Sequence, residues 1–377
     1  MKYRVEFGEL RLGDASRKNL LEVWESSWAS AGPKVSQFEK RWGELFGYKY
    51  NKAVSSGTDA DINACLCLYD LGAKEGDEII VPALSFIATA NSVLAAGFKP
   101  VFVDVEKETL NINPLKIEAK ITPKTRAIMA VSTMGKPPEM NVIRHICDSN
   151  KLTFILDNCE GHGCMFKGQY AGRIADVSTY SFYVAHLICC GEGDMVSTGR
   201  EDIADVVNST RSHGRKNGDL YFDHIRRGFN SKMNDLEASL GLEGIDNFDE
   251  TFHKRRFNVN KLINGCADLD EFAWFNKEEE YEVCCPHAFS ITLKDPKFNY
   301  KKLYDYLEQN GVKTKRNFGS IPTQHKAFSF MGHKLGDFPE AEYIGSNGMH
   351  VGVHQYLQEE DIDYMIELLH DYFHKHV

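Results

Sequence analysis

The 377-residue sequence contains no apolar run that approaches the length of a membrane span. A helix that crosses a bilayer needs about 20 consecutive, mainly apolar residues. The opening residues, MKYRVEFGEL, also lack the apolar core of a secretory signal. We therefore expect a cytoplasmic protein that neither crosses nor binds a membrane.

The sequence has fewer basic than acidic residues. Lys and Arg total 44 against 54 Asp and Glu, which gives a formal net charge of −10. Because nucleic acids and anionic membranes are bound through basic surfaces, this balance argues against a general nucleic-acid binder. It leaves room for a small anionic ligand at a locally basic site. The composition is otherwise that of a globular protein, with 42% hydrophobic and 26% charged residues.

The ten cysteines lack the spacing of a disulfide framework, and thiols stay reduced in the cytoplasm. Cys159, His162 and Cys164 offer soft metal ligands close together in the sequence. A structural zinc site needs four ligands, and no second cluster matches this one, so we predict no metal site. The close pairs of cysteines are Cys65 and Cys67, Cys189 and Cys190, and Cys284 and Cys285.

Short strand-like runs alternate with helical segments over the first two thirds of the chain. The runs lie at 78–82, 100–104, 127–132, 154–157, 177–182 and 194–198, and helical spacing is found at 16–31, 35–46, 59–71, 88–96, 140–149 and 231–245. Apolar strands separated by helices are typical of a parallel sheet covered on both faces. The tight turn at 191–193 indicates that the last strand is antiparallel. Residues 1–245 are thus predicted to form an α/β domain.

The pattern changes after Phe248, where helices and strands follow one another in an α+β order. We expect helices up to Cys266, at 300–309 and at 359–374, and strands at 288–293, 312–316 and 349–353. Residues 246–377 are therefore predicted to form a smaller α+β domain packed on the first.

Three short motifs have the residue types of a binding or catalytic site. Ser55-Ser56-Gly57-Thr58 precedes a helix, where free N–H groups attract a phosphate, although such a motif also serves as a plain helix cap. Asp157 ends an apolar strand, and a carboxylate there can hold a protonated ring nitrogen or cap the next turn. His186 lies in a loop that follows a strand ending at Ser181. Taken singly, each motif has an ordinary structural explanation.

Taken in chain order, these segments resemble the DegT/DnrJ/EryC1/StrS sugar aminotransferases, a family of fold-type I pyridoxal enzymes. The resemblance extends over essentially the whole chain. It includes Gly32-Pro33, 54–58, 76–82, 85–91, Asp104, His213-Gly214, 228–230 and 233–235. It implies an aspartate aminotransferase-like fold, with a large, mostly parallel sheet domain and a small C-terminal α+β domain. It also implies a homodimer whose active sites are shared between subunits.

One difference from the family aminotransferases bears on function. The sixth residue of the loop that begins Ser181-Phe182 is their Schiff-base lysine, and here it is His186. Without that amine the usual covalent resting state with the cofactor cannot form. A branch of sugar 3-dehydratases that use pyridoxamine 5'-phosphate shares this change, and 157–160, 181–186 and 350–355 resemble GDP-4-keto-6-deoxymannose 3-dehydratase. The related CDP-sugar branch carries an iron–sulfur cluster, which is not expected here because the cysteine spacing around Cys65 does not match.

The resemblance implies a site for pyridoxal or pyridoxamine 5'-phosphate. Phe86 stacks on the cofactor ring, Asp157 binds the ring nitrogen and Glu160 lies near the ring. Gly57, Thr58 and Ser181 hold the cofactor phosphate, together with Asn230 from the partner subunit. A basic segment with Arg211, His213 and Arg215 is expected to bind the diphosphate of a nucleotide sugar, and the alternative for each of these three is a solvated surface position.

The implied reaction removes the C3 hydroxyl of a nucleotide-linked 4-keto-6-deoxy sugar. His186, with a neutral imidazole at cytoplasmic pH, acts first as the base and then as the acid. Ammonia and a 3-deoxy-4-keto sugar are released. L-glutamate then restores the amine form of the cofactor by half-transamination.

Two alternatives remain open at this stage. The chain is a sugar aminotransferase that uses another lysine, such as Lys232, or a non-catalytic regulatory relative. The retained Asp157 and Glu160 argue against the regulatory relative. Asp194 stands where the family usually has a second glycine after Gly193, and Lys232 stands where arginine is common. These differences concern the substrate more than the cofactor.

Overall fold

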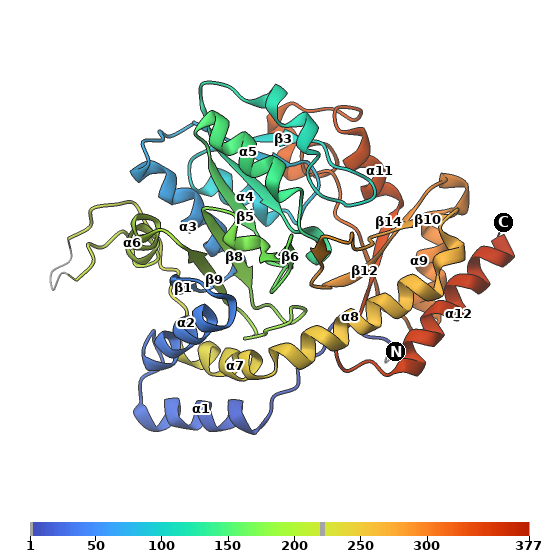
Figure 1. Cartoon of the computed structure of the whole chain (residues 1–377), viewed down its shortest axis with the longest axis horizontal. Helices are drawn as coiled ribbons and strands as arrows, with labels where there is room; N and C mark the ends of the chain where they lie inside the picture. The colour runs from blue at the N-terminus through green and yellow to red at the C-terminus, as the bar shows by residue number, and fades with distance from the viewer. Residues whose placement is uncertain (1–2, 219–222, 377) are drawn as a thin grey trace.

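A large mixed sheet lies at the centre of the fold (Figure 1). The structure is a computed structural model that describes residues 3–218 and 223–376. Within these residues the strands of the large sheet are β1 (Tyr50–Val54), β2 (Glu78–Pro82), β3 (Lys99–Val103), β4 (Thr125–Val131), β5 (Thr153–Asp157), β8 (Val177–Ser181) and β9 (Asp194–Thr198). Their order is β1-β9-β8-β5-β4-β2-β3, and β9 is antiparallel to both of its neighbours. The predicted antiparallel strand is confirmed.

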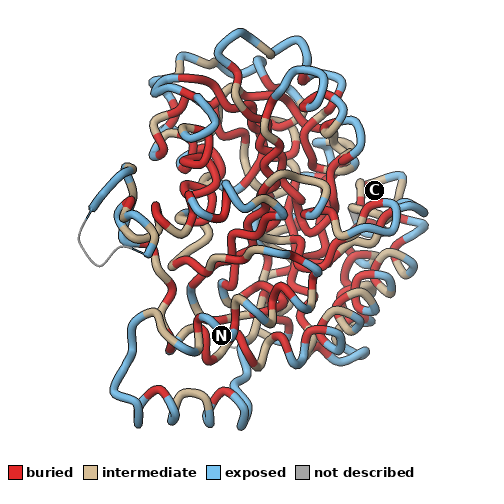
Figure 2. The backbone as a smooth tube through the Cα atoms, turned by 60° about the vertical axis from the view of Figure 1, so that its left-hand side comes forward, coloured by how far each residue is buried: buried red, intermediate tan, exposed pale blue. Residues whose placement is uncertain are grey.

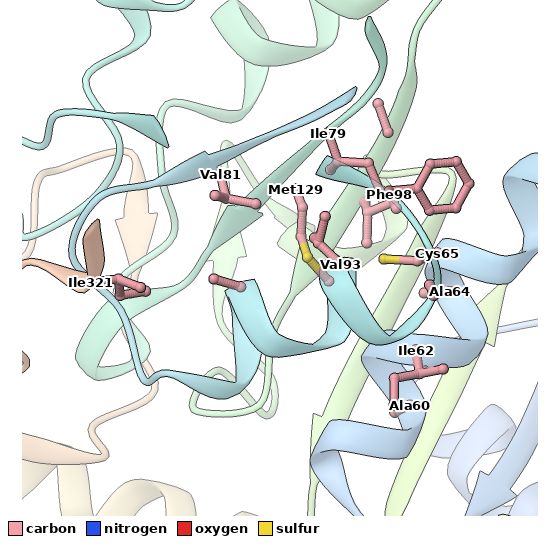
Figure 3. Close-up of a cluster of buried hydrophobic side chains, with 14 of the residues drawn as sticks. Ala60, Ile62, Ala64, Cys65, Ile79, Val81, Val93, Phe98, Met129 and Ile321 are labelled. Carbon is pink, nitrogen blue, oxygen red and sulfur yellow. The ribbon is translucent and has the colours of Figure 1, made fainter. Parts of the chain in front are cut away.

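Helices cover both faces of this sheet. One face carries α3 (Gly57–Asp70), α4 (Ala88–Ala95) and α6 (Glu201–Thr210), and the other carries α2 (Pro33–Phe46), α5 (Met140–Asn150) and α7 (Asp235–Asp246). Ile79 and Val81 of β2 belong to the core under α3 and α4, while Ile80 between them belongs to the opposite core. Strands buried on both faces explain the continuous apolar runs in the sequence. Figure 3 shows part of the first core, where Val81 of β2, Met129 of β4 and Val93 of α4 lie together.

The small domain is built on an antiparallel sheet. Its strands, in the order β10-β12-β14-β13, are β10 (Ala273–Phe275), β12 (Ala288–Leu293), β14 (Gly348–Gly352) and β13 (Thr314–Arg316). Its helices are α8 (Phe248–Gly265), α9 (Tyr300–Gln309), α10 (Ile321–Gln324), α11 (Pro339–Asn347) and α12 (Glu359–His376). Helices α8 and α12 lie side by side (Figure 1). The N-terminal residues also join this domain, because Val5 is buried in its core and forms a bridge with Val312.

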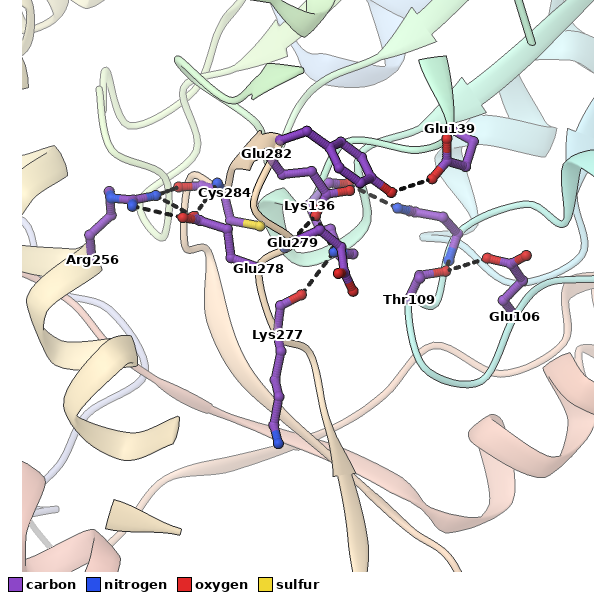
Figure 4. A network of polar contacts seen from close by, with 12 residues as sticks. Glu106, Thr109, Lys136, Glu139, Arg256, Lys277, Glu278, Glu279, Glu282 and Cys284 are labelled. Atoms are coloured by element: carbon purple, nitrogen blue, oxygen red, sulfur yellow. Dashed lines mark hydrogen bonds and ion pairs between the residues drawn. The ribbon is translucent and has the colours of Figure 1, made fainter. Parts of the chain in front are cut away.

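A small three-stranded sheet links the two domains. Strand β11 (Glu282–Val283) pairs with β6 (Met165–Phe166), which pairs with β7 (Gln169–Tyr170). Figure 4 shows the polar contacts around this link. Lys136 forms a buried ion pair with Glu282 and donates from Nζ to the carbonyl oxygen of Lys277 at 2.8 Å. These contacts fix the segment that leads into β12.

The strands of the large sheet are largely buried, and the exposed residues lie mainly in the surrounding helices and loops (Figure 2). Helix α1 (Asp14–Ser26) packs on α7 and leaves several large apolar side chains in solvent. Trp24 is 83% exposed and Leu21 is 52% exposed. No helix in the described part of the chain is both long and apolar enough to span a membrane.

The structure corrects two predicted helices and adds strands β1, β6, β7, β10 and β11. The helix expected at 231–245 begins only at Asp235, because the Asn234 side chain caps it by accepting from the Glu237 N–H at 3.0 Å. Residues before the cap are extended, and Lys232 bridges to Val54. The helix expected at 16–31 ends at Ser26, since Ser27 has a φ of 56°.

Candidate active site

Asp157 lies at the carboxyl end of β5, in the centre of the large sheet, and is buried. The Thr89 hydroxyl donates to Asp157 Oδ2 at 2.7 Å, and the Cys159 N–H donates to Oδ1 at 3.3 Å. Ser85 supports Thr89 through a 2.9 Å contact between the two hydroxyl oxygens. Among the described residues, no lysine or arginine forms an ion pair with Asp157. A buried carboxylate that lacks a cationic partner fits a protonated ring nitrogen.

The loop after β8 carries His186, which is 9% exposed. Its N–H donates to the Tyr183 carbonyl at 2.9 Å, and the loop closes where the Phe182 N–H donates to the Gly193 carbonyl at 2.9 Å. The buried Arg255 of α8 donates to the carbonyl oxygens of Ala185 and His186 at 2.9 and 3.1 Å. The position of His186 is therefore fixed through its own backbone.

His186 belongs to a row of aromatic rings that crosses the domain boundary. Its ring centroid lies 4.9 Å from that of His287 and 5.7 Å from that of His162. Burial lowers the pKa of His186 well below its ordinary value, and His162, Arg255 and Lys315 lower it further. Burial also lowers the pKa of His287 strongly. His186 is therefore a neutral imidazole with an unprotonated ring nitrogen at physiological pH.

Glu160 lies next to this row of rings. The Met134 N–H donates to Glu160 Oε2 at 2.6 Å, and His287 Nε2 lies 3.5 Å from Oε1. Burial raises the pKa of Glu160 to about 8, so its carboxyl group is mainly protonated near neutral pH. A neutral acid beside neutral imidazoles keeps the charge in this part of the site low.

The residues predicted for the phosphate gather at the start of α3. Ser56 is the N-cap, and its hydroxyl accepts from the Asp59 N–H at 3.2 Å. Gly57 begins the helix, where backbone N–H groups have no partner within the helix. A Cβ at Gly57 would lie 3.4 Å from Ser181 Oγ, so glycine keeps this end of the site open. Thr58 is exposed on the same turn.

Phe86 and this chain's own Asn230 are both exposed. Asn230 is exposed, and the next residue, Ser231, accepts at its carbonyl from the Ser55 N–H at 3.0 Å. Phe86 is 61% exposed and lies edge-on to Phe318, with 6.1 Å between ring centroids. Phe86 follows Ser85, which is linked through Thr89 to Asp157, and its exposed aromatic face suits a stacked ring.

The basic segment is only partly available for a ligand. Arg211 donates to Glu39 Oε1 at 2.5 Å and to the Ala53 carbonyl at 2.8 Å, so it ties α2 to β1. His213 is exposed, and its N–H donates to the Phe229 carbonyl. Arg215 is half-buried and bridges to His224 through the backbone. The segment between Arg215 and His224 includes residues outside the described ranges.

The cysteine and histidine spacing noted in the sequence does not form a ligand cluster. His162 packs among aromatic rings, 5.6 Å from the Trp42 centroid, and Cys164 Sγ contacts Asn158 Oδ1. Cys159 instead lies with two carboxylates, Asp61 and Asp157, and the potential ligand atoms of the three lie within 4.8 Å of one another. All ten cysteines are free thiols.

Four residues of the site were not identified from the sequence: Thr89, Arg255, His287 and Lys315. Lys315 of β13 lies in register with His350 and holds its Nζ 3.7 Å from the Phe7 ring centroid. Its pKa is lowered by burial, while Glu160 raises it. Thr89 comes from α4 of the large domain, whereas the small domain supplies Arg255 of α8, His287 just before β12 and Lys315 of β13. No local motif therefore connects these residues to Asp157 or His186.

The fold and the site together define an enzyme of the pyridoxal-phosphate type. The carboxylate at the strand end, the open helix start and the exposed aromatic ring fit a phosphorylated pyridine. The family model for the DegT/DnrJ/EryC1/StrS aminotransferase family matches residues 11–370, and the chain belongs to this family. The family depends on pyridoxal phosphate.

Known relatives include both dehydratases and aminotransferases. The chain is 30% identical to a dTDP-4-dehydro-2,6-dideoxy-D-glucose 3-dehydratase of Saccharopolyspora spinosa, covering 97% of this chain and 85% of the relative. It is also 30% identical to GDP-perosamine synthase of Caulobacter vibrioides, covering 97% of each. The E. coli GDP-4-keto-6-deoxy-D-mannose-3-dehydratase, solved with bound hydrated PLP, superposes with a TM-score of 0.90 at 25% identity, over 98% of this chain and all of the other.

Proposed function

We propose that the protein is a 3-dehydratase of a nucleotide-linked 4-keto-6-deoxy sugar, with GDP-4-keto-6-deoxymannose as the substrate. One observation carries the proposal: the loop position at which family aminotransferases have their lysine is His186, a buried and neutral imidazole. The relatives that are named as dehydratases support this choice. GDP-perosamine synthase, which is equally similar in sequence, does not have a dehydratase name and does not support it.

The cofactor, when bound, supplies an amine and a ring that accepts electrons. Asp157 holds the proton of the ring nitrogen and thereby keeps that ring electron-poor. His186 takes a proton from the carbon next to the amine and returns one to the leaving C3 hydroxyl. An imidazole with a lowered pKa is free to act as the base at neutral pH, and burial excludes water that would compete for the proton.

The proposal also covers the amino donor, the oligomeric state of the enzyme and its cellular compartment. L-glutamate restores the amine form of the cofactor, and the reaction takes place in the cytoplasm. The active form is a homodimer in which Asn230 of the partner subunit completes each phosphate site. An exposed apolar hollow of about 810 Å³, lined by Leu12, Leu20, Leu21, Trp24 and Leu236 beside α1, supports self-association.

The fate of nitrogen tests the function directly. The enzyme is loaded with the cofactor and supplied with ¹⁵N-labelled L-glutamate and GDP-4-keto-6-deoxymannose. Dehydration releases the label as ammonia and gives a 3-deoxy sugar, whereas transamination keeps the label in an amino sugar. The variant His186→Asn serves as the matched control and is expected to lose the dehydration. A labelled amino sugar as the only product contradicts the proposal.

An aminotransferase is the second candidate, and Lys315 is the observation that favours it. Its amine lies close enough to Glu160 and His186 to influence the pKa of both. A lowered pKa is also a property of lysines that react with carbonyl groups. Lys232 is less suited, because its Nζ contacts Ser212 Oγ at 3.3 Å. The variant Lys315→Met is expected to abolish amino-sugar formation if this candidate is correct, and to leave ammonia release intact if it is not.

A further inference from the structure

Three carboxyl groups lie buried beneath the start of α3. Asp61 comes from α3, Asp157 from the end of β5 and Asp194 from the first position of β9. Asp194 is 0% exposed and lies in register with Ser181 of β8 on one side and Val54 of β1 on the other. Asp194 therefore sits in the sheet directly below the turn that carries Gly57.

The Asp194 carboxyl group lies next to Gly57, one of the residues predicted to hold the phosphate. Its Oδ1 accepts from the Tyr180 N–H at 2.8 Å, and its Oδ2 lies 3.6 Å from Cys159 Sγ. A Cβ built on Gly57 would lie 3.2 Å from Asp194 Oδ2, closer than its distance from Ser181 Oγ. Asp194 Oδ2 therefore lies close to Gly57, and the family resemblance implies that the Gly57 backbone binds the phosphate.

The ionisable groups that act most strongly on Asp194 are Asp157 and Cys159, and both are acids. Asp157 and Cys159 lie beside it, and Asp61 is close enough to be affected by both carboxyl groups. Asp61 accepts from the Thr179 hydroxyl at 2.8 Å, and burial followed by repulsion from Asp157 raises its pKa well above its ordinary value. In the described residues no lysine, arginine or histidine pairs with any of the three carboxyl groups. Burial, followed by repulsion from Asp157, raises the pKa of Asp194 well above its ordinary value.

A bound cofactor adds negative charge at this point. Its phosphate is close to a dianion at neutral pH, and Asp157 must be ionised to hold the ring-nitrogen proton. An ionised Asp194 would repel both groups in a region that water screens poorly. A protonated Asp194 removes this repulsion, and its O–H is a donor that a glycine at the same position does not provide.

We propose that Asp194 is a neutral acid in the cofactor-loaded protein, so that phosphate binding and protonation of Asp194 are linked. The proposal rests on the cofactor that the family shares and is independent of the choice between dehydration and transamination. Linkage works in both directions, so the phosphate favours the proton on Asp194 and loss of that proton weakens phosphate binding. The residue acts on the cofactor's affinity and takes no part in the chemistry at His186.

The test compares affinities for pyridoxamine 5'-phosphate across pH. The full-length protein is titrated with this amine, which forms no bond to lysine, from about pH 7 to about pH 9.5, where the phosphate itself no longer titrates. Wild type is expected to lose about tenfold or more in affinity over this range relative to Asp194→Asn, which keeps the shape but cannot ionise. Asp249→Asn, at an exposed carboxylate on α8, is the matched control and follows wild type.

A second measurement detects the proton on Asp194 directly and uses a different variant, Asp194→Gly, for comparison. Infrared difference spectra of the loaded protein are expected to contain the C=O stretch of a protonated carboxylic acid that is absent from Asp194→Gly. Parallel affinity profiles of wild type and Asp194→Asn overturn the proposal. A carboxylate signal alone for Asp194 in the loaded protein overturns it as well.

Discussion

Arg255 holds the backbone of His186 in place from another domain. Its Nη2 donates to the His186 carbonyl at 3.1 Å and its Nη1 donates to the Ala185 carbonyl at 2.9 Å. Arg255 is itself buried, and its Nε donates to Gln355 Oε1 at 3.1 Å. A residue of α8 thus orients the proposed base without touching its imidazole, which makes Arg255 a positioning residue.

Replacement of Arg255 by Met should lower kcat more than it changes KM. Two buried carbonyl oxygens lose their donors, at about 1–3 kcal/mol each, and the loop that carries His186 gains freedom. Misplacement of a base by a fraction of an ångström is expected to reduce kcat by about tenfold or more. Arg255→Lys, which keeps one donor, should fall between the two. Arg41→Met, at a surface ion pair with Asp246, is the control, and an equal loss there would contradict the role.

The stability of the protein should depend on the protonation of Glu160. Its folded-state pKa of about 8 lies above the ordinary value of 4.5, so the folded state binds the proton more tightly. Stability is then fully present below about pH 4.5 and is lost as pH rises toward 8. Glu160→Gln removes this dependence, and we expect a difference of roughly 2–5 kcal/mol between the two proteins' pH profiles.

Urea unfolding at a series of pH values measures this effect. Glu271→Gln, at an exposed glutamate, is expected to keep the wild-type profile. If wild type and Glu160→Gln lose stability in parallel between pH 5 and about 8, the buried proton on Glu160 is refuted.

The ion pair between Lys136 and Glu282 should be strongly coupled. Both side chains are almost fully buried, at 4% and 3% exposure. Removal of one partner leaves an uncompensated charge, so Lys136→Met is expected to destabilise the protein by about 3–5 kcal/mol. The double variant Lys136→Met with Glu282→Leu should recover most of this loss. Additive losses in thermal or urea unfolding would show that the pair is not coupled.

The sequence predicted the elements whose signals are local. Strand β2 agrees with the predicted bounds at 78–82 because a strand buried on both faces of the sheet is a continuous apolar run. Strand β9 agrees with the predicted bounds at 194–198, and the tight turn at 191–193 marks its start. The helix expected to begin at Ser231 begins at Asp235, since the cap at Asn234 and the bridge from Lys232 to Val54 outweigh helical spacing. Periodicity alone cannot detect a tertiary contact of that kind.

The candidate site was predictable only where it follows a motif. Asp157 ends a strand, Gly57 begins a helix and His186 lies in the loop after a strand, and these positions carry recognisable patterns. Arg255 and His287 reach the site from the small domain, where nothing in their neighbouring sequence marks them. The charge state of the site was equally hidden, because the pKa of Glu160 depends on burial created by the fold.

Borohydride trapping is the most direct test of the central claim that His186 replaces the Schiff-base lysine. The protein is mixed with pyridoxal 5'-phosphate, reduced with borohydride and examined by intact mass and by absorbance after addition of L-glutamate. We predict conversion to the amine form of the cofactor and no covalent adduct, while the variant His186→Lys gives a fixed adduct. An adduct on a lysine of the wild-type protein would contradict the account and return it to the aminotransferases.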